Sequence, residues 1–389
     1  MQRTFKFRLY PSRSQEKQMK EHLRMAKDLQ NKLLTYSIEN YSKTGKFPSK
    51  FDLQRLAKGE GLYSQTQQTI AHKVSDSIFR VFKLRKKGIK CGFPRFKSID
   101  RVKSLLYPQF GFKLGNKLKV TPFGEISIKQ HRNIEGKVKT LTLKREPSGK
   151  WFAIFCVEPE RKEPKTNHRE KIGLDLGLKT FATLSNGDRI GNPRHLKRYE
   201  NRLASYQQIL SKKKKGSNNR NKAKLNVARI YEKISNARSD FLHKVSTQLV
   251  NDYSFIALEK LASREMSKKR FGKQINDAGW NMFANMLRYK AEEAGCKVIF
   301  VDPKNTTQMC SCCHQMVEKD LLDRIHDCPS CGLVIDRDHN AAINILNRGL
   351  RQIGQELPEF KPLREGTDTD KKLCQQVPLM KEEATCLSW

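Results

Sequence analysis

The chain has 389 residues and a formal net charge of +37 at pH 7. This length is enough for two or three domains, and a hydrophobic fraction of 37% excludes a wholly disordered chain. No apolar run approaches the roughly 20 residues that cross a bilayer, and the first residues lack the apolar stretch of a signal peptide. We therefore expect a soluble, cytoplasmic protein.

The charge predicts a polyanionic partner, because a folded chain this basic repels itself unless counter-charges surround it. A membrane surface is the less favoured partner, since no basic amphipathic helix with Trp or Leu on its other face stands out. Charge alone does not separate a ribosomal-type structural protein from an enzyme that acts on nucleic acid.

The N-terminal half is predicted to combine strands with helices. Residues 2–9 alternate apolar and basic side chains, which is typical of a half-buried strand. Ser12 or Ser14 can cap the helix that follows, to about residue 41, and more helix is expected over 51–85 with a break around 59–63.

Short alternating runs between residues 92 and 158 indicate a small β barrel or sandwich. Residues 171–190 then read as two apolar strands joined at Gly177, with a hairpin turn at Asn186-Gly187. A long basic helical stretch is expected over 193–253.

The remaining segments alternate strands with helices, which is typical of an α/β sheet domain. They are a strand at 254–261, a helix at 279–295, a strand at 297–303, a cysteine cluster and a helix at 338–350. Residues 351–389 have little periodicity and scattered Pro and Gly, so we expect a mostly disordered tail.

Two Cys-x-x-Cys pairs, separated by fourteen residues, have the spacing of a four-cysteine zinc ribbon. Four thiolates would close the coordination sphere, so one structural Zn²⁺ is expected at Cys310, Cys313, Cys328 and Cys331. Disulfides are the alternative, which a reducing compartment disfavours.

Other cysteines and histidines are weaker candidates. Three lie near enough in sequence to replace a ligand: Cys312, His314 and His326. The isolated cysteines are expected to be core or tail residues: Cys91, Cys156, Cys296, Cys374 and Cys386.

Three carboxylates lie in unusual places. Asp175 is embedded in the apolar strand IGLDLG, Glu259 ends the apolar strand FIALE, and Asp338 precedes the helix HNAAINIL. A buried acid costs several kcal/mol unless it is paired or binds a metal. Each acid alone could be a salt-bridge partner, and Asp338 could be an N-cap. Together on an α/β sheet they suggest a site for paired Mg²⁺ ions.

The chain resembles the TnpB (OrfB) proteins of bacterial and archaeal insertion sequences, compact relatives of type V CRISPR effectors. The resemblance extends from about Phe5 to Leu350. Its most specific segments include RLYPSRSQEK, GFPRFKS, IGLDLGLKTFATLSNG, FIALEKL, VDPKNTTQMCSCCH and DCPSCGLVIDRDHNAAINIL. The family's D-x-N-A-A signature falls on Asp338, which favours Asp338 over Asp336 as the third acid. His314 stands where the family usually has Gly.

The resemblance implies an α+β multidomain protein. Its parts would be a wedge-like β barrel at 1–12 and 92–168, a helical recognition insertion at 13–91, a RuvC/RNase H-like nuclease domain at 169–303 and 336–350, an inserted zinc ribbon at 304–335, and a disordered tail at 351–389.

The resemblance also implies the activity of an RNA-guided DNA endonuclease encoded by a transposable element. Two catalytic Mg²⁺ ions at Asp175, Glu259 and Asp338 would hydrolyse both strands of a double-stranded target beside a short transposon-adjacent motif. A guide RNA from the transposon end would select the target. We expect a monomer in the prokaryotic cytoplasm, associated with the nucleoid and with no membrane partner.

Two basic segments are candidates for nucleic-acid contact. Residues 194–238 contain fourteen Lys or Arg and two Glu, and residues 79–103 interleave four Phe with basic side chains. A solvated helix face, and Phe side chains in the core, are the alternatives. The candidate contacts are Lys212, Lys213, Lys214, Lys215, Arg220, Lys222, Lys224, Arg95 and Lys97.

Two other functions stay open at this point: a nuclease-inactive RNA-guided DNA-binding repressor and a zinc-ribbon RNA-binding structural protein. A phosphate-binding G-x-x-x-x-G-K-[ST] loop, a G-x-S-x-G nucleophile elbow and a His-x-His pair are all missing from the sequence. This argues against an ATPase, a serine hydrolase and a tyrosine transposase.

Overall fold

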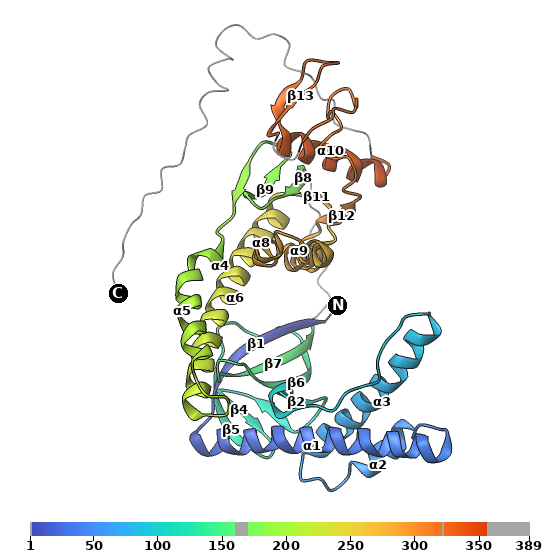
Figure 1. The fold of residues 1–389 in the computed structure, drawn as a ribbon, viewed down its shortest axis with the longest axis vertical. Coiled ribbons are helices and arrows are strands. Elements are labelled where there is room, and N and C mark those ends of the chain that lie inside the picture. Colours follow the sequence, from blue (N-terminus) through green and yellow to red (C-terminus); the bar gives the residue numbers. More distant parts are fainter. Residues whose placement is uncertain (1, 160–169, 321–322, 356–389) are drawn as a thin grey trace. The chain divides into compact units, whose positions relative to one another are not determined.

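A computed structural model describes residues 2–159, 170–320 and 323–355. The chain forms two compact units (Figure 1). The described parts of the first unit are residues 2–159 and 201–233, and those of the second are residues 170–200, 234–320 and 323–355. In the described residues, no helix is long and apolar enough to span a membrane.

The first unit contains a seven-stranded antiparallel sheet in the order β2-β6-β7-β1-β5-β4-β3. Its strands are β1 (Arg3–Tyr10), β2 (Ser104–Tyr107), β3 (Phe112–Leu114), β4 (Lys117–Val120), β5 (Gly124–Lys129), β6 (Lys137–Arg145) and β7 (Trp151–Glu158).

This sheet curls into a nearly closed barrel. The Tyr107 hydroxyl, at the end of edge strand β2, donates a 2.9 Å hydrogen bond to the carbonyl of Thr121, just after β4. Phe5, Phe7 and Leu9 alternate along β1 into the barrel core. The predicted β module is therefore confirmed, although its strands begin at Ser104 rather than at Gly92.

Helices follow β1, as predicted. They are α1 (Arg13–Thr44), α2 (Lys50–Leu56) and α3 (Ser64–Lys86), with a short 3-10 turn at Ile99–Arg101. Ser12, not Ser14, is the N-cap of α1: its hydroxyl accepts from the Gln15 amide N–H, and the Gln15 side chain accepts in return from the Ser12 N–H. The predicted break between α2 and α3 is confirmed.

The predicted helical stretch over 193–253 is interrupted. It comprises α4 (His195–Arg198), α5 (Glu200–Ser211) and α6 (Asn218–Asp252). Lys212–Lys215 lie in the loop between α5 and α6, so the expectation that they lie on a helix is wrong. The next residue, Gly216, lies in the same loop and has a φ of +83°, a left-handed conformation that Gly adopts without strain.

The second unit contains a five-stranded sheet in the order β10-β9-β8-β11-β12. Its elements are β8 (Lys171–Leu176), β9 (Thr180–Leu184), β10 (Arg189–Gly191), β11 (Phe255–Glu259), α7 (Ser263–Met266), α8 (Gly272–Ala278), α9 (Trp280–Ala294), β12 (Lys297–Val301) and α10 (Arg337–Gln352). Strands β8, β11 and β12 are parallel, whereas β9 and β10 run antiparallel to their neighbours.

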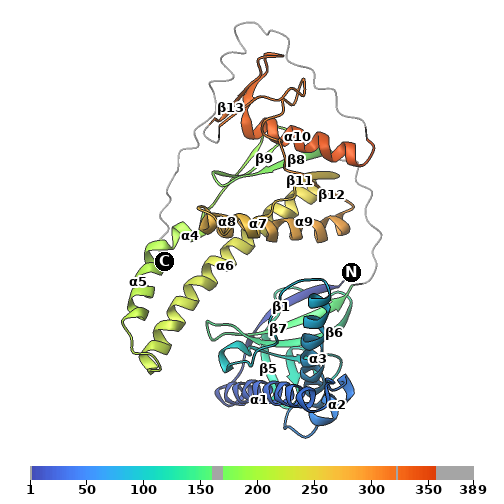
Figure 2. The ribbon, with the colours of Figure 1, turned by 45° about the vertical axis from the view of Figure 1, so that its right-hand side comes forward.

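This sheet is the middle layer of three (Figure 2). Ile172, Leu174 and Ile256 pack with the second half of α6, α8 and α9 on one face. Phe255, Ala257 and the apolar side of α10 pack together on the other face. The predicted alternation of strands and helices is confirmed, but the small helices α7 and α8 were not predicted.

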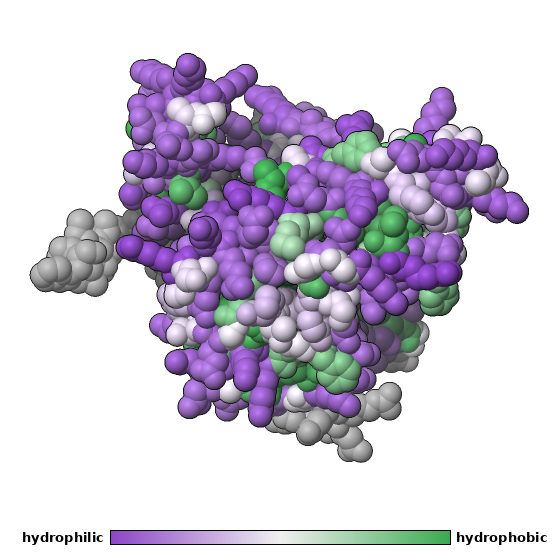
Figure 3. Space-filling model, turned by 90° about the horizontal axis from the view of Figure 1, so that it is seen from below, coloured by the Kyte–Doolittle hydropathy of each residue, from purple (hydrophilic) through white to green (hydrophobic). Residues whose placement is uncertain are grey.

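A two-stranded hairpin, β13 (Ile325–Asp327) and β14 (Val334–Asp336), leads directly into α10. The surface in Figure 3 is largely hydrophilic, and its hydrophobic residues form separate patches. This suits a chain of charge +37. The predicted tail lies outside the described residues from residue 356 onward; before it, α10 continues to Gln352.

Candidate metal centres

Asp175 and Glu259 lie at neighbouring positions on adjacent parallel strands. The register of β8 and β11 pairs Leu174 with Leu258, and each acid is the next residue along its strand. Both acids therefore lie at the carboxyl ends of their strands, where ligands bind in open α/β sheets.

Both acids lie on the sheet face that α10 covers, because residues two apart on a strand share a face. Gly173 faces α10 so closely that a Cβ there would lie 2.8 Å from the Leu346 amide nitrogen. On β11, Ala257 meets α10 in the same way, since a Cβ on Gly349 would lie 2.6 Å from the Ala257 Cβ. Two glycines thus allow the close approach of α10 to the strands that carry the acids.

Asp338 lies in the first turn of α10, but it is not the N-cap. Asp336 caps the helix, since its Oδ1 accepts from the amide N–H groups of Asp338 and His339 at 3.0 and 3.1 Å. The expectation that Asp338 could cap the helix is therefore wrong. The Asp338 carboxylate instead accepts from Nε and Nη2 of Arg337 at 3.1 and 3.0 Å.

Two of the three acids, Asp175 and Glu259, have a raised pKa. Burial raises the pKa of Asp175 to about 8, with the negative charges of Glu259 and Asp338 adding to the effect. Burial also raises the pKa of Glu259, which is 9% exposed, against the lowering effect of a hydrogen bond from Thr306. Carboxylates that repel in a low-dielectric site suit a divalent cation, which prefers oxygen ligands.

Glu259 and Asp338 are close enough to Asp175 to raise its pKa, but the ligand atoms of the three acids do not all lie within 4.8 Å of one another. Within the described ranges, the only group of three or more metal-ligating residues whose ligand atoms all lie within 4.8 Å is the set of four cysteines.

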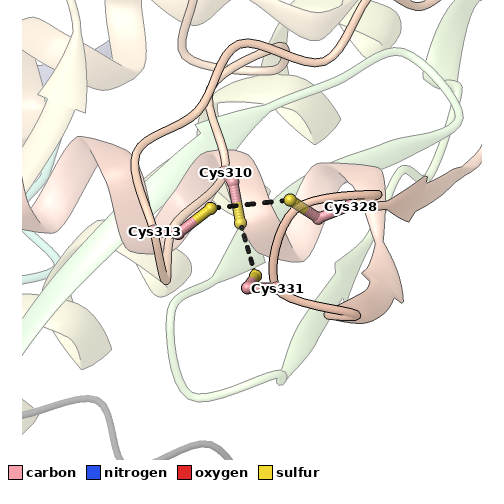
Figure 4. A group of neighbouring side chains, drawn as sticks. All are labelled: Cys310, Cys313, Cys328 and Cys331. Carbon is pink, nitrogen blue, oxygen red and sulfur yellow. Dashed lines mark hydrogen bonds between the residues drawn. The ribbon is translucent and has the colours of Figure 1, made fainter.

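The four predicted cysteines do meet (Figure 4). The sulfur atoms of Cys310 and Cys331 are 3.7 Å apart, and those of Cys313 and Cys328 are 3.5 Å apart. A tetrahedral zinc site with Zn–S bonds of about 2.3 Å places its sulfurs about 3.8 Å apart. The geometry of the cluster therefore fits Zn²⁺.

The two cysteine turns have the same backbone pattern. In the first, the Cys310 N–H donates to the Gln315 carbonyl and the His314 N–H donates to the Cys310 carbonyl. In the second, the Cys328 N–H donates to Leu333 and the Gly332 N–H to Cys328. His314 has a φ of +63° and Gly332 one of +70°. His314 therefore adopts the left-handed conformation that its glycine counterpart adopts in the second turn.

The alternative ligands do not join the cluster. Cys312, His314 and His326 are absent from the group of ligand atoms within 4.8 Å. The buried His326 contacts the Lys319 Nζ through its Nδ1. Three further cysteines are free thiols outside the four-cysteine cluster: Cys91, Cys156 and Cys296. Cys374 and Cys386 lie outside the described residues.

The predicted nucleic-acid contacts differ in exposure. Lys212–Lys215, Lys222 and Arg95 are exposed. The Arg220 guanidinium instead donates to the carbonyls of Leu210 and Lys213, which holds the α5–α6 loop together. Lys224 pairs with Asp100 at 3.5 Å, and Lys97 is half-buried.

Of the four Phe residues in the basic segment 79–103, two are packed against the core and two are exposed. Phe82 and Phe93 pack against the core of the first unit, as the alternative interpretation expected. Phe79 and Phe96 are 54% and 55% exposed and remain available for stacking.

Comparison with known proteins gives three family matches. The match described as "Probable transposase" spans residues 154–270, "Cas12f1-like, TNB domain" spans 280–345, and "Helix-turn-helix domain" spans 1–46. In this structure residues 3–44 are β1 and the single long helix α1, joined at Ser12.

Two relatives match nearly the whole chain, and a third matches half of it. A "Putative RNA-guided DNA endonuclease" of Streptomyces pristinaespiralis is 31% identical, over 97% of this chain and 96% of the relative. The "Putative RNA-guided DNA endonuclease InsQ" of Escherichia coli K12 is 29% identical, over 93% and 96%. The "CRISPR-associated endodeoxyribonuclease Cas12f1" of Sulfoacidibacillus thermotolerans is 27% identical over 50% of each chain. Given the near-complete match at 31% identity, this chain belongs to the TnpB (OrfB) family.

Proposed function

We propose that the protein is an RNA-guided DNA endonuclease that cuts double-stranded DNA at a RuvC-like site. The observation that carries this proposal is the placement of Asp175 and Glu259 side by side on parallel strands, on the sheet face covered by α10, whose first turn carries Asp338. The names of its near-full-length relatives support the same activity.

Asp175, Glu259 and Asp338 would hold two Mg²⁺ ions. When bound, such ions stabilise the attacking and leaving oxygens of an in-line phosphodiester displacement. The chain's own contribution is to present three carboxylates from one sheet face and one helix. Arg337 donates to Oδ1 of Asp338 and Thr306 donates to Oε1 of Glu259. Arg324 lies 3.9 Å from Oδ2 of Asp338, so a bound ion would share that oxygen with a guanidinium group.

The four-cysteine cluster would hold one structural Zn²⁺. Metal analysis of the purified chain should give one zinc per chain, and Cys328→Ser should lose it. Cys312→Ser is the matched control and should keep it, because Cys312 lies outside the cluster. Zinc-free wild-type protein with both cysteine pairs oxidised would contradict this assignment.

We assign the nucleic-acid partners as a guide RNA and its DNA target. The barrel at 1–12 and 92–168 and the helices at 13–91 would hold the guide and read the adjacent motif. Residues 169–303 and 336–350 would form the nuclease domain, with the ribbon at 304–335 and the tail at 351–389. The exposed lysines of the α5–α6 loop support contact with phosphates. We also propose that the protein acts as a monomer in the prokaryotic cytoplasm.

A nuclease-inactive repressor is disfavoured because burying an ionised carboxylate costs folding free energy. Asp175 is half-buried, and its raised pKa shows that its ionised form is unfavourable there. A protein that only binds DNA gains nothing from this arrangement.

Guide replacement tests the proposed function. RNA that co-purifies with the chain is sequenced, and its target-pairing segment is exchanged for a second sequence. Cutting of a plasmid should move to sites that match the new segment. Cutting that ignores the exchanged segment, or a chain that retains no RNA, would refute RNA guidance.

A further inference from the structure

A buried threonine contacts one of the three acids. The Thr306 hydroxyl donates a 2.6 Å hydrogen bond to Oε1 of Glu259, and Thr306 is only 2% exposed. A hydroxyl bound to a carboxylate forms a short, charge-assisted hydrogen bond that restricts the rotation of the acid. Glu259 therefore has one oxygen engaged and the other left for a further ligand.

Two asparagines of α10 hold the loop that carries Thr306. The side-chain amide of Asn344 donates to the carbonyls of Thr306 and Met309 at 3.0 and 2.6 Å. Asn340 donates to the Met309 carbonyl at 2.8 Å and accepts from the Ser311 N–H at 2.9 Å. Both asparagines are buried and lie four residues apart, so they project from one side of α10.

This loop continues directly into the first cysteine turn, since Cys310 lies between Met309 and Ser311. The same short segment is thus bonded to Glu259 on β11, to α10 behind Asp338, and through Cys310 to the four-sulfur cluster. Two sets of contacts therefore hold this segment in place. One is the meeting of the four cysteines, and the other is the hydrogen bonds from Asn340 and Asn344 of α10.

We propose that Thr306 is a positioning residue that orients Glu259 for divalent-cation binding, and that the first cysteine turn holds Thr306 in place. The inference rests on the proposed function, because it assigns Glu259 as a ligand of the catalytic ion. Residues that hold metal ligands by hydrogen bonds commonly change metal affinity by about 10- to 100-fold when they are removed.

Mn²⁺ binding tests the inference directly. The full-length chain, freed of nucleic acid in high salt, is titrated with Mn²⁺ and the free ion is measured by electron paramagnetic resonance. Thr306→Val, which removes the hydroxyl but keeps the shape, should weaken binding by about 10-fold. Thr306→Ser should restore wild-type affinity, because it keeps the hydroxyl. Thr306→Ala provides a second loss of the hydroxyl if the valine variant does not fold.

Thr307→Val is the matched control, because the neighbouring Thr307 hydroxyl makes no hydrogen bond among the residues that the structure describes. Equal weakening by Thr306→Val and Thr307→Val, or wild-type binding by both hydroxyl-free Thr306 variants, would overturn the inference. Asp175→Ala separates this outcome from failure of the proposed function. If Asp175→Ala also leaves Mn²⁺ binding unchanged, the proposed ion site itself is wrong.

Zinc removal tests the second half of the proposal. Chelation that empties the cysteine cluster should weaken Mn²⁺ binding by wild-type protein at least as much as Thr306→Val does. It should add little to the defect of Thr306→Val, because the same positioning contact is already lost. Unchanged Mn²⁺ affinity in zinc-free, folded wild type would refute a role for the cysteine turn.

Discussion

Asp175 lowers the stability of the metal-free protein as the pH rises. In the folded chain it keeps its proton to a pH of about 8, because burial and the charges of Glu259 and Asp338 raise its pKa. An unfolded aspartate loses its proton near pH 4. The folded state therefore binds more protons between about pH 4 and pH 8, and the free energy of unfolding falls across that window.

Asp175→Asn should remove this pH dependence. Without divalent ions, the variant should gain stability over wild type by up to about 1.4 kcal/mol per pH unit from pH 5 to pH 8. Thermal unfolding in the presence of a chelator measures the difference. Asp240→Asn, at an exposed acid of α6, is the control and should give a constant offset. A difference that does not grow with pH would show that Asp175 ionises normally.

Helix α10 depends on small residues in the layers around it. Gly173 lets the helix backbone approach β8, and Gly349 lets α10 approach Ala257 and Phe255 of β11. Because α10 carries Asp338, the distance between α10 and the sheet sets how far Asp338 lies from Asp175 and Glu259.

Gly173→Ala should separate α10 from the sheet. Its added methyl group would press against the backbone of Ala342 and Leu346, and overpacking of this kind costs about 1–3 kcal/mol or more. Denaturant unfolding should show that loss, and DNA cutting should fall with it. Gly191→Ala on edge strand β10 is the control, since a Cβ there meets nothing within 4 Å. Equal stability of the two variants would contradict the close approach of α10.

Local patterns predicted most of these elements. The alternation of Phe5, Phe7 and Leu9 and the apolar run of β11 indicate strands without knowledge of the fold. The loop at Lys212–Lys215 was missed because four lysines suit a helix as well as a turn.

The candidate site was predictable only in part. A buried acid in an apolar strand and paired cysteines stand out in the sequence. The resemblance favoured Asp338 over Asp336 as the third acid, but that Asp336 is the N-cap could not be predicted without the backbone geometry of α10. Thr306 carries no local signal at all, because its partner Glu259 is distant in sequence.

At the scale of the whole molecule, the charge of +37 requires a counter-surface. The exposed lysines of the α5–α6 loop have no acidic partner within the residues that the structure describes. Each lysine that neutralises a phosphate releases condensed counterions, so the affinity for RNA should fall steeply as salt rises.

Lys212–Lys215 changed together to Gln should reduce the slope of log affinity against log salt, by up to about 0.7–0.9 per lost phosphate contact. Binding titrations at several salt concentrations measure this slope. Arg at the same four positions keeps the charge and should keep the slope. The chosen target should not change, since base pairing with the guide selects it. Identical slopes for wild type and the Gln variant would show that these lysines point into solvent.

Plasmid cleavage by wild type and Asp175→Ala tests the central claim most directly. Both proteins are loaded with the same guide, supplied with Mg²⁺, and assayed for target binding and for cutting of both strands. We predict that Asp175→Ala binds the target with near wild-type affinity and cuts it at least 10³-fold more slowly, because an ion ligand is lost while the basic surface is retained. Wild-type cutting by Asp175→Ala would contradict the assignment of the nuclease site.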